Sequence, residues 1–221
     1  PPLPLPEGRG NVELAERLPH VRWIGGGSGA GKTTVASRLA ADHGLRLYSC
    51  DPVQSEHTRR SNPVEHPLLH DFLAMDMDER WVNRPPSVML KTFHGFQGEG
   101  FHLVLEDLLA LPEEPPIVAE GFKLLPRLVS PLLSGPNQAV WLVPTPRFRR
   151  AAVEMRGSTW DIAGRTSNPE QALANLLARD ELFTDEVVKQ AAARALRVIE
   201  VDGTLSLDDL TMRVAESLGL T

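Results

Sequence analysis

The sequence predicts an α/β protein of three layers, in which helices cover both faces of a parallel sheet of about five strands. Five short apolar runs alternate with helical patterns along the 221 residues, and this alternation is typical of parallel sheets. The runs are apolar at nearly every position, as expected for strands buried on both faces. A glycine-rich turn joins the first run to the first helical pattern. Ligands of such sheets bind beyond the carboxyl ends of the strands, so we expect functional residues there.

The predicted strands are rich in β-forming residues and are separated by turn or helix signals. In chain order they read VRWIG, LRLYS, PIVAE, AVWLV and RVIEV, at residues 21–25, 45–49, 116–120, 139–143 and 197–201.

Helical patterns fill the intervals between these runs. The first runs from Lys32 to His43, with apolar residues on one face and Gly44 as a stop signal. A second covers residues 99–111 and ends before Pro112. Later helices are expected from the N-cap Asn168 and Pro169 toward Arg179, near 184–196, and from the capping box of Ser206 and Asp209 through Leu218.

Composition excludes several classes of protein. The net charge of −6 argues against a protein whose main task is to grip nucleic-acid backbone. No apolar run approaches the ~20 residues needed to span a bilayer, so a membrane partner is not expected. One cysteine, Cys50, excludes an intramolecular disulfide and fits a reducing, cytoplasmic location. Residues 1–20 are read as a proline-rich, extended N-terminal extension ahead of a domain covering 21–221.

The stretch GGSGAGKT, from Gly26 to Thr33, fits G-x-x-x-x-G-K-[ST] at every fixed position and lies between a strand and a helix, as that motif requires. Glycines let successive backbone N–H groups converge on a phosphate, and the helix adds its positive end. Lys32 would neutralise the β- and γ-phosphates of ATP, and the Thr33 hydroxyl would bind Mg²⁺. The candidate nucleotide-binding residues are therefore Gly26, Gly27, Ser28, Gly29, Ala30, Gly31, Lys32, Thr33 and Thr34.

A dinucleotide-binding turn uses some of the same residues. Gly25, Gly27 and Ala30 match the looser pattern G-x-G-x-x-A, and Asp51 could hold a ribose. That site has no use for a lysine followed by a threonine, so the phosphate-loop interpretation is preferred.

With its glycine loop, the chain resembles the P-loop kinases of small molecules, which include uridine, shikimate, gluconate and nucleoside monophosphate kinases. The resemblance extends over most of residues 21–221, but only the loop is specific. It implies a P-loop NTPase fold with strand order 2-3-1-4-5, an acceptor-covering insert at 52–98 and a mobile lid at 145–168. Four weaker features agree with it: Asp51 after the second strand, Glu120-Gly121 after the third, the arginines of PTPRFRR after the fourth, and Arg179-Asp180 with Asp202-Gly203 further on.

The resemblance assigns roles to these positions. It implies catalytic roles for Lys32, Asp51, Glu120, Arg147 and Arg150, with Asp51 taking the acceptor's proton. It implies that Thr33 and Glu120 hold Mg²⁺, and that Arg179, Asp202 and Gly203 contact the nucleotide. Each position also has an ordinary structural explanation: an aspartate before a proline initiates turns, and lid arginines such as Arg149, Arg156 and Arg165 can simply be solvated.

The acceptor side is less informative. Between residues 52 and 98, Arg59, Arg60, Arg84 and Lys91 could meet an anionic acceptor, whereas Trp81, Phe93 and Phe96 could wall an apolar one. His66 and His70, four residues apart, are more often incidental than a zinc site. The identity of the acceptor and the oligomeric state stay open.

We therefore expect an ATP- and Mg²⁺-dependent phosphotransferase that acts on a hydroxyl or phosphate of a small molecule. A kinase of nucleic-acid ends, and an ATP-binding regulatory protein or ATPase without an acceptor, remain alternatives. A regulatory GTPase is disfavoured because the guanine-reading patterns N-K-x-D and T-K-x-D are absent from the sequence. The D-x-x-G pattern at Asp161 does not follow the third strand and is attributed to chance.

Overall fold

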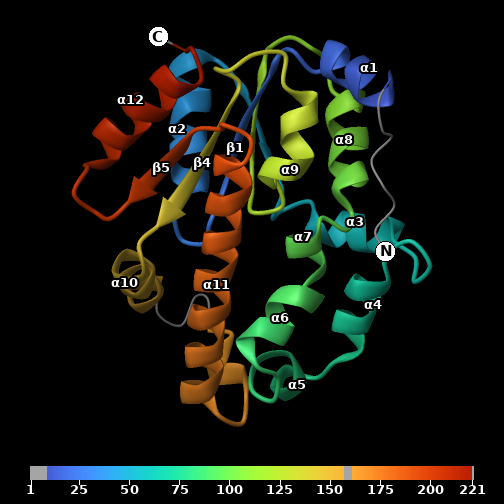
Figure 1. Ribbon diagram of the computed structural model, residues 1–221, viewed down its shortest axis with the longest axis vertical. Coiled ribbons are helices and arrows are strands. Elements are labelled where there is room, and N and C mark those ends of the chain that lie inside the picture. The colour runs from blue at the N-terminus through green and yellow to red at the C-terminus, as the bar shows by residue number, and fades with distance from the viewer. Residues whose placement is uncertain (1–8, 157–160, 221) are drawn as a thin grey trace.

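The computed structural model describes residues 9–156 and 161–220. Its centre is a five-stranded parallel sheet in the order β2-β3-β1-β4-β5, with helices on both faces (Figure 1). The predicted fold class is thus confirmed, and the strand order is the one that the family resemblance implies. The strands are β1 (Val21–Gly26), β2 (Arg46–Ser49), β3 (Ile117–Glu120), β4 (Ala139–Pro144) and β5 (Val198–Val201).

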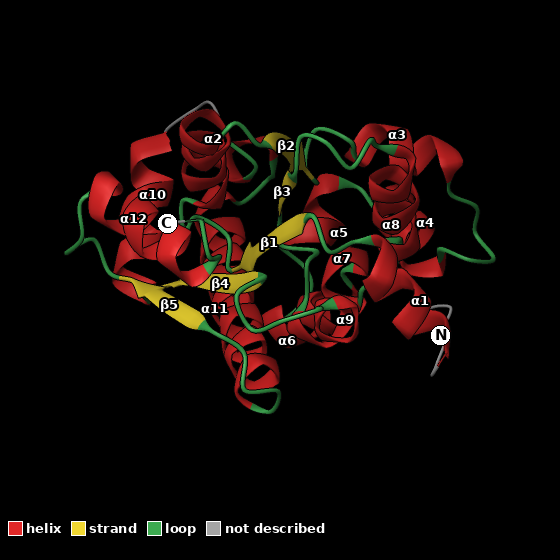
Figure 2. Ribbon diagram, turned by 90° about the horizontal axis from the view of Figure 1, so that it is seen from above, coloured by secondary structure: helices red, strands yellow, loops and turns green. Residues whose placement is uncertain are grey.

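Alternate residues of the strands feed two separate cores, because successive side chains of a strand point to opposite faces of the sheet. On one face, Ile24, Val118 and Leu142 pack with α2 (Lys32–His43) and α12 (Leu207–Ser217). On the other, Trp23, Ala119 and Trp141 pack with α8 (Phe101–Ala110), α9 (Pro126–Val129) and α11 (Pro169–Ala192). Figure 2 shows α2 and α12 on one side of the sheet and α9 and α11 on the other.

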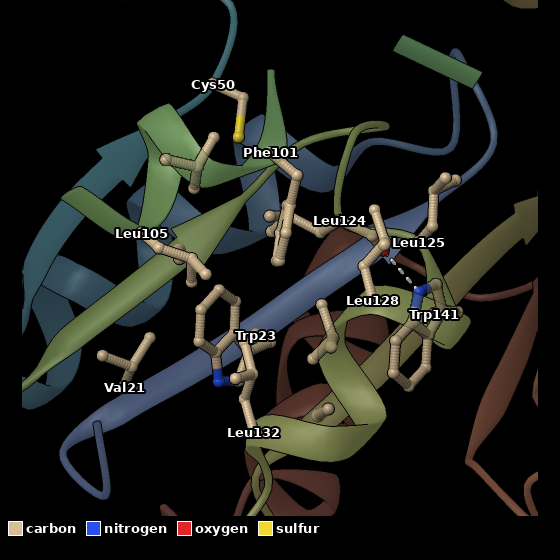
Figure 3. Close-up of a cluster of buried hydrophobic side chains, with 14 of the residues drawn as sticks. Val21, Trp23, Cys50, Phe101, Leu105, Leu124, Leu125, Leu128, Leu132 and Trp141 are labelled. Atoms are coloured by element: carbon tan, nitrogen blue, oxygen red, sulfur yellow. Dashed lines mark hydrogen bonds between the residues drawn. The ribbon is translucent and has the colours of Figure 1, made fainter. Parts of the chain in front are cut away.

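Trp141, in the core that packs with α8, α9 and α11, lies against Gly25, just before the glycine loop. Trp141 is fully buried, and its Nε1 donates a hydrogen bond to the carbonyl oxygen of Leu124 at 2.8 Å (Figure 3). A Cβ atom at Gly25 would lie 2.3 Å from that nitrogen. The absence of a side chain at Gly25 therefore leaves space for the indole of Trp141, which belongs to the neighbouring strand β4.

The helices expected from Lys32 onward follow the sequence predictions with two differences. The bounds of α2 are those predicted, and Ser206 caps α12 by accepting a hydrogen bond from the backbone N–H of Asp209. By contrast, α8 begins at Phe101, after Gly100 in the left-handed conformation. The two helical segments expected after Asn168 form one helix, α11, of 24 residues, because no glycine or proline interrupts it and its buried residues recur at helical spacing throughout.

The N-terminal segment is more structured than its prolines suggest. Residues Arg9–Arg17 form helix α1 where an extended segment is expected, and residues 1–8 lie outside the described part. Leu14 packs against the core that contains Trp23 and Trp141, in which Leu18 is fully buried. The apolar face of this helix is thus part of the folded domain.

The two regions expected to cover the ligands are largely helical. The acceptor region consists of α3 (Gln54–Arg60), α4 (Pro67–Ala74), α5 (Met77–Trp81), α6 (Pro86–Thr92) and α7 (His94–Gln97). The predicted lid contains α10 (Pro146–Arg156) and the 3₁₀ turn η3 (Ala163–Arg165), while 157–160 lie outside the described residues. Within the described ranges, no helix has the length and apolar character needed to cross a membrane.

Candidate active site

The glycine loop between β1 and α2 adopts a backbone that side chains would obstruct. Gly26 has a φ of 122°, and a Cβ atom there would lie 1.9 Å from the carbonyl oxygen of Leu142 in the neighbouring strand. Gly29 has a φ of 78°, and its Cβ would lie 3.0 Å from the Cδ atom of Arg149. The loop thus forms a tight turn at the start of α2, and bare backbone of this kind at a helix N-terminus suits a phosphate group.

Lys32 is folded back across this loop. Its side chain is buried, with 8% of the residue exposed, and its Nζ donates a hydrogen bond to the carbonyl oxygen of Gly27 at 2.7 Å. Burial lowers the pKa of Lys32, an effect that the neighbouring carboxylates of Glu120 and Asp51 oppose. An anion in the loop would offer this desolvated ammonium group a charged partner in addition to a neutral carbonyl.

Thr33 and Glu120 form a hydroxyl–carboxylate pair beside the lysine. The Oγ1 of Thr33 donates to Oε1 of Glu120 at 3.2 Å. Burial raises the pKa of Glu120, although hydrogen bonding from Ser49 and the charge of Lys32 work in the opposite direction. A divalent cation would favour the ionised carboxylate. A hydroxyl and a carboxylate oxygen that line the same cavity fit the way Mg²⁺ is usually held in nucleotide sites, where phosphate and water oxygens supply the other ligands.

A cavity of about 300 Å³ lies beside the glycine loop and brings most of the predicted site together. The glycine loop, Asp51 and Glu120 contribute polar groups to its lining, and aromatic side chains contribute apolar surface. Asp51 is exposed at the edge of this cavity. Its described lining is Ser28, Gly29, Gly31, Lys32, Thr33, Thr34, Asp51, Phe72, Trp81, Phe93, Phe96, Glu120, Gly121, Phe122, Ile162, Arg179 and Asp180.

Two arginines meet at one buried carboxylate on the wall of this cavity. Asp180 accepts from Nη2 of Arg149 at 2.6 Å through Oδ2, and from Nη2 of Arg179 at 2.6 Å through Oδ1. Arg149 lies against Gly29 of the loop. Arg179 lies with its guanidinium carbon 5.0 Å from the ring centroids of Trp81 and Phe96. The arrangement supplies two positioned cations near the expected phosphate site.

The structure brings many of the predicted residues to one place. Ser28, Gly29, Gly31, Lys32, Thr33 and Thr34 of the loop line the cavity, while Gly26, Gly27 and Ala30 are buried beneath it. Asp51, Glu120 and Arg179 lie on the same cavity. Their roles in binding and catalysis stay predictions.

Other predicted residues lie elsewhere. Arg147 and Arg150 are exposed and line a second cavity of about 420 Å³ between α10 and α11. Asp202 accepts hydrogen bonds from the backbone N–H and the hydroxyl of Thr204, at 2.9 and 2.7 Å, and Gly203 lies against Phe148. Neither Asp202 nor Gly203 is among the described residues that line these two cavities.

Three of the four cations expected on the acceptor side serve as structural links. Arg59 pairs with Glu56 on α3, and Arg60 binds Asp107 and Glu106 of α8. Arg84 donates to the carbonyl oxygens of Glu79 and Arg80 and to the hydroxyl of Thr92. The remaining one, Lys91, is exposed on α6.

The zinc interpretation of His66 and His70 finds no support in the described residues. His70 shares a hydrogen bond with the hydroxyl of Ser61, and His66 is buried with its ring beside that of His102. In the part of the chain that the structure covers, no three His, Cys, Asp or Glu side chains are placed to hold a metal ion together.

Sequence reasoning missed three features of the site. From the sequence, Asp180 is named only as the residue after Arg179, whereas in the structure its carboxylate also binds Arg149. Phe72 and Phe122 complete the aromatic wall but come from separate elements. One signal in the sequence could have found Asp180. At helical spacing, Arg179 and Asp180 fall on the face of α11 that also buries Leu176 and Phe183.

Comparison with known proteins gives low similarities. No protein-family model and no curated protein sequence matches the chain. Among solved structures, a gluconokinase from Sinorhizobium meliloti aligns with 92% of this chain and 94% of its own, at 15% identity and a TM-score of 0.49. An uncharacterized protein from Eubacterium ventriosum aligns with 91% of this chain and 98% of its own, at 14% identity and a TM-score of 0.47. Thymidylate kinase from Candida albicans aligns with 90% of this chain and 91% of its own, at 15% identity and a TM-score of 0.45.

Proposed function

We propose that the protein binds Mg·ATP at the glycine loop and transfers the γ-phosphoryl group to a hydroxyl, or to a phosphate, of a small molecule. The observation that carries this proposal is a single cavity. Lys32 and Thr33 of the loop, the carboxylates Asp51 and Glu120, and the guanidinium of Arg179 all line it. Phosphoryl transfer needs this combination of positioning groups and positive charge more than it needs covalent chemistry.

Each residue has a distinct task in the proposed reaction. Bound Mg·ATP would supply the phosphoryl group. Lys32 and the arginines stabilise negative charge on the transferred group, because their charges are held in place by the protein. Thr33 and Glu120 hold the Mg²⁺ ion. Asp51 accepts the proton of the acceptor hydroxyl as the acceptor oxygen forms the new bond to the γ-phosphorus and the bond from that phosphorus to the leaving ADP breaks.

The location and lid are part of the same proposal. We place the protein in the cytoplasm, where ATP is available and the buried thiol of Cys50 stays reduced. The segment 145–168 would close over the nucleotide and exclude water, which otherwise competes with the acceptor. Within it, the sequence favours Arg147 and Arg150 as phosphate contacts, whereas the position of Arg149 beside Gly29 makes it the stronger candidate.

Equilibrium binding of ATP with and without Mg²⁺ tests the nucleotide site. We expect Mg²⁺-dependent binding by the native chain, and a loss of about a hundredfold or more in Lys32→Ala, because that variant removes a desolvated charge from the phosphate site. Lys91→Ala, which removes an exposed lysine outside the cavity lining, is the matched control. If Lys32→Ala binds Mg·ATP as the native chain does, the proposal is wrong.

An acceptor screen separates the remaining alternatives. ATP consumption is measured with sugars, nucleosides, hydroxylated drugs and oligonucleotides with free 5′-hydroxyl ends. Turnover that depends on a small molecule supports the proposal. Turnover that depends only on oligonucleotides would indicate a kinase of nucleic-acid ends, and acceptor-independent turnover would indicate an ATPase.

A further inference from the structure

Building on the proposed function, we infer that the acceptor has a flat aromatic or heterocyclic body, one reactive hydroxyl and no negative charge. The inference rests on which charged and aromatic side chains line the cavity beside the glycine loop.

Five aromatic side chains that line the cavity contact one another and form an aromatic wall. Phe72 contacts Trp81 and Phe93 edge-on, with ring centroids 5.8 and 5.2 Å apart. Phe93 and Phe96 lie 4.8 Å apart, and Phe96 meets Phe122 edge-on at 5.7 Å. All five rings line the cavity. Such a wall offers a flat apolar body the offset and edge-to-face contacts that aromatic groups prefer.

The described lining has no surplus of positive charge to bind an anionic acceptor. Its cations are Lys32 and Arg179, and its carboxylates are Asp51, Glu120 and Asp180. Both Nε and Nη2 of Arg179 bind Oδ1 of Asp180, a carboxylate that also binds Arg149. Arg59, Arg60 and Arg84 are engaged by other groups outside the cavity lining. A sugar acid or a nucleoside monophosphate would therefore bring an anion against aromatic carbon, at a high desolvation cost.

A polyhydroxylated acceptor fits no better. A polyol would place several hydroxyls against rings that cannot accept strong hydrogen bonds, and unpaired buried polar groups are costly. Among the lining residues, Asp51 is a polar group that could receive one hydroxyl.

Binding of matched ligand pairs tests this inference. The native chain is saturated with Mg²⁺ and a non-hydrolysable ATP analogue and titrated calorimetrically. The pairs are 2-naphthylmethanol against 2-naphthoate, and uridine and thymidine against their 5′-monophosphates, with glucose and gluconate as polyols. We expect the neutral member of each pair to bind about tenfold or more tightly than its anion, and the polyols not to bind.

Substitutions in the aromatic wall show whether the neutral ligand binds there. Phe93→Ala should weaken the neutral ligand by about tenfold and Phe93→Leu, which keeps apolar volume, by less. Val88→Ala, an exposed apolar position of α6 outside the cavity lining, should change nothing. Thermal denaturation checks that each variant folds. If Phe93→Ala does not fold, the binding measured with Phe93→Leu is used in its place.

The possible failures are distinguishable. If the anions bind as tightly as the neutral members, or if no neutral aromatic alcohol binds at millimolar concentration while the ATP analogue does, this inference is overturned and the proposed function stands. If the ATP analogue fails to bind but the neutral alcohols bind at Phe93, the proposed function alone is overturned.

Discussion

The Oδ2 atom of Asp180 accepts a hydrogen bond from Nη2 of Arg149 at 2.6 Å, and only 2% and 5% of the two side chains are exposed. The other oxygen of the same carboxylate binds Arg179. One residue of α11 thus orients two guanidinium groups around the glycine loop. Because the carboxylate offsets part of their charge, both cations can stay buried before any phosphate arrives.

The first prediction concerns the stability of this cluster. Asp180→Asn keeps the shape of the side chain but leaves two buried guanidinium groups without their carboxylate, so we expect it to lower the free energy of unfolding by about 3–5 kcal/mol. Urea denaturation measures the change. Glu181→Gln, at the exposed neighbouring position, should stay within about 0.5 kcal/mol of the native chain. Equal stability of Asp180→Asn and the native chain would contradict the structural role.

The second prediction distinguishes the lid arginines. Arg149→Ala should lower kcat for phosphoryl transfer by about a hundredfold or more, because it removes a cation held beside Gly29. Arg147→Ala and Arg150→Ala remove exposed side chains of the second cavity and should each change kcat by less than about threefold, as expected for surface substitutions away from the reacting groups. Arg149→Lys tests whether charge alone suffices. If Arg147 or Arg150 shows the larger loss, the assignment based on sequence is the correct one.

The fold could be predicted because its signals are local. Strands buried on both faces are apolar runs, and the phosphate loop is a contiguous motif whose strand and helix flank it. The site residues at strand ends followed from the same logic, since the carboxyl ends of parallel strands share one edge of the sheet. Asp51 and Glu120 were found in this way, and both line the cavity.

The rest of the site depends on tertiary packing and has no local signal. Arg147, Arg149 and Arg150 lie within one turn of a helix, and only the rotation of α10 against α11 decides which of them faces the loop. The partner of Arg149 is 31 residues away in sequence. The aromatic wall likewise combines Phe72 of α4, Phe93 ahead of α7 and Phe122 after β3, which no periodic pattern connects.

The third prediction concerns the proposed base. Asp51→Asn should lower the rate of phosphoryl transfer by about 10²–10⁴-fold while leaving Mg·ATP affinity near normal, because the amide cannot take the acceptor's proton. Single-turnover transfer and equilibrium binding measure the two properties separately. Asp42→Asn, an exposed aspartate of α2, should leave both unchanged. A parallel loss of binding and transfer in Asp51→Asn would remove Asp51 from the role of base.

The fourth prediction is a dependence of stability on pH. Burial, followed by repulsion from Lys123 and His66, lowers the pKa of His94 from 6.5 to about 3. Between these values the unfolded chain binds a proton that the folded chain does not, so this residue makes stability fall as the pH is lowered through that range, by up to about 1.4 kcal/mol per pH unit. Urea denaturation between about pH 7.5 and pH 4.5 should show a shallower fall for His94→Gln than for the native chain, since glutamine does not titrate. The exposed His43 supplies the control, because His43→Gln should retain the native slope. An unchanged slope in His94→Gln would mean that folding does not lower the pKa of His94.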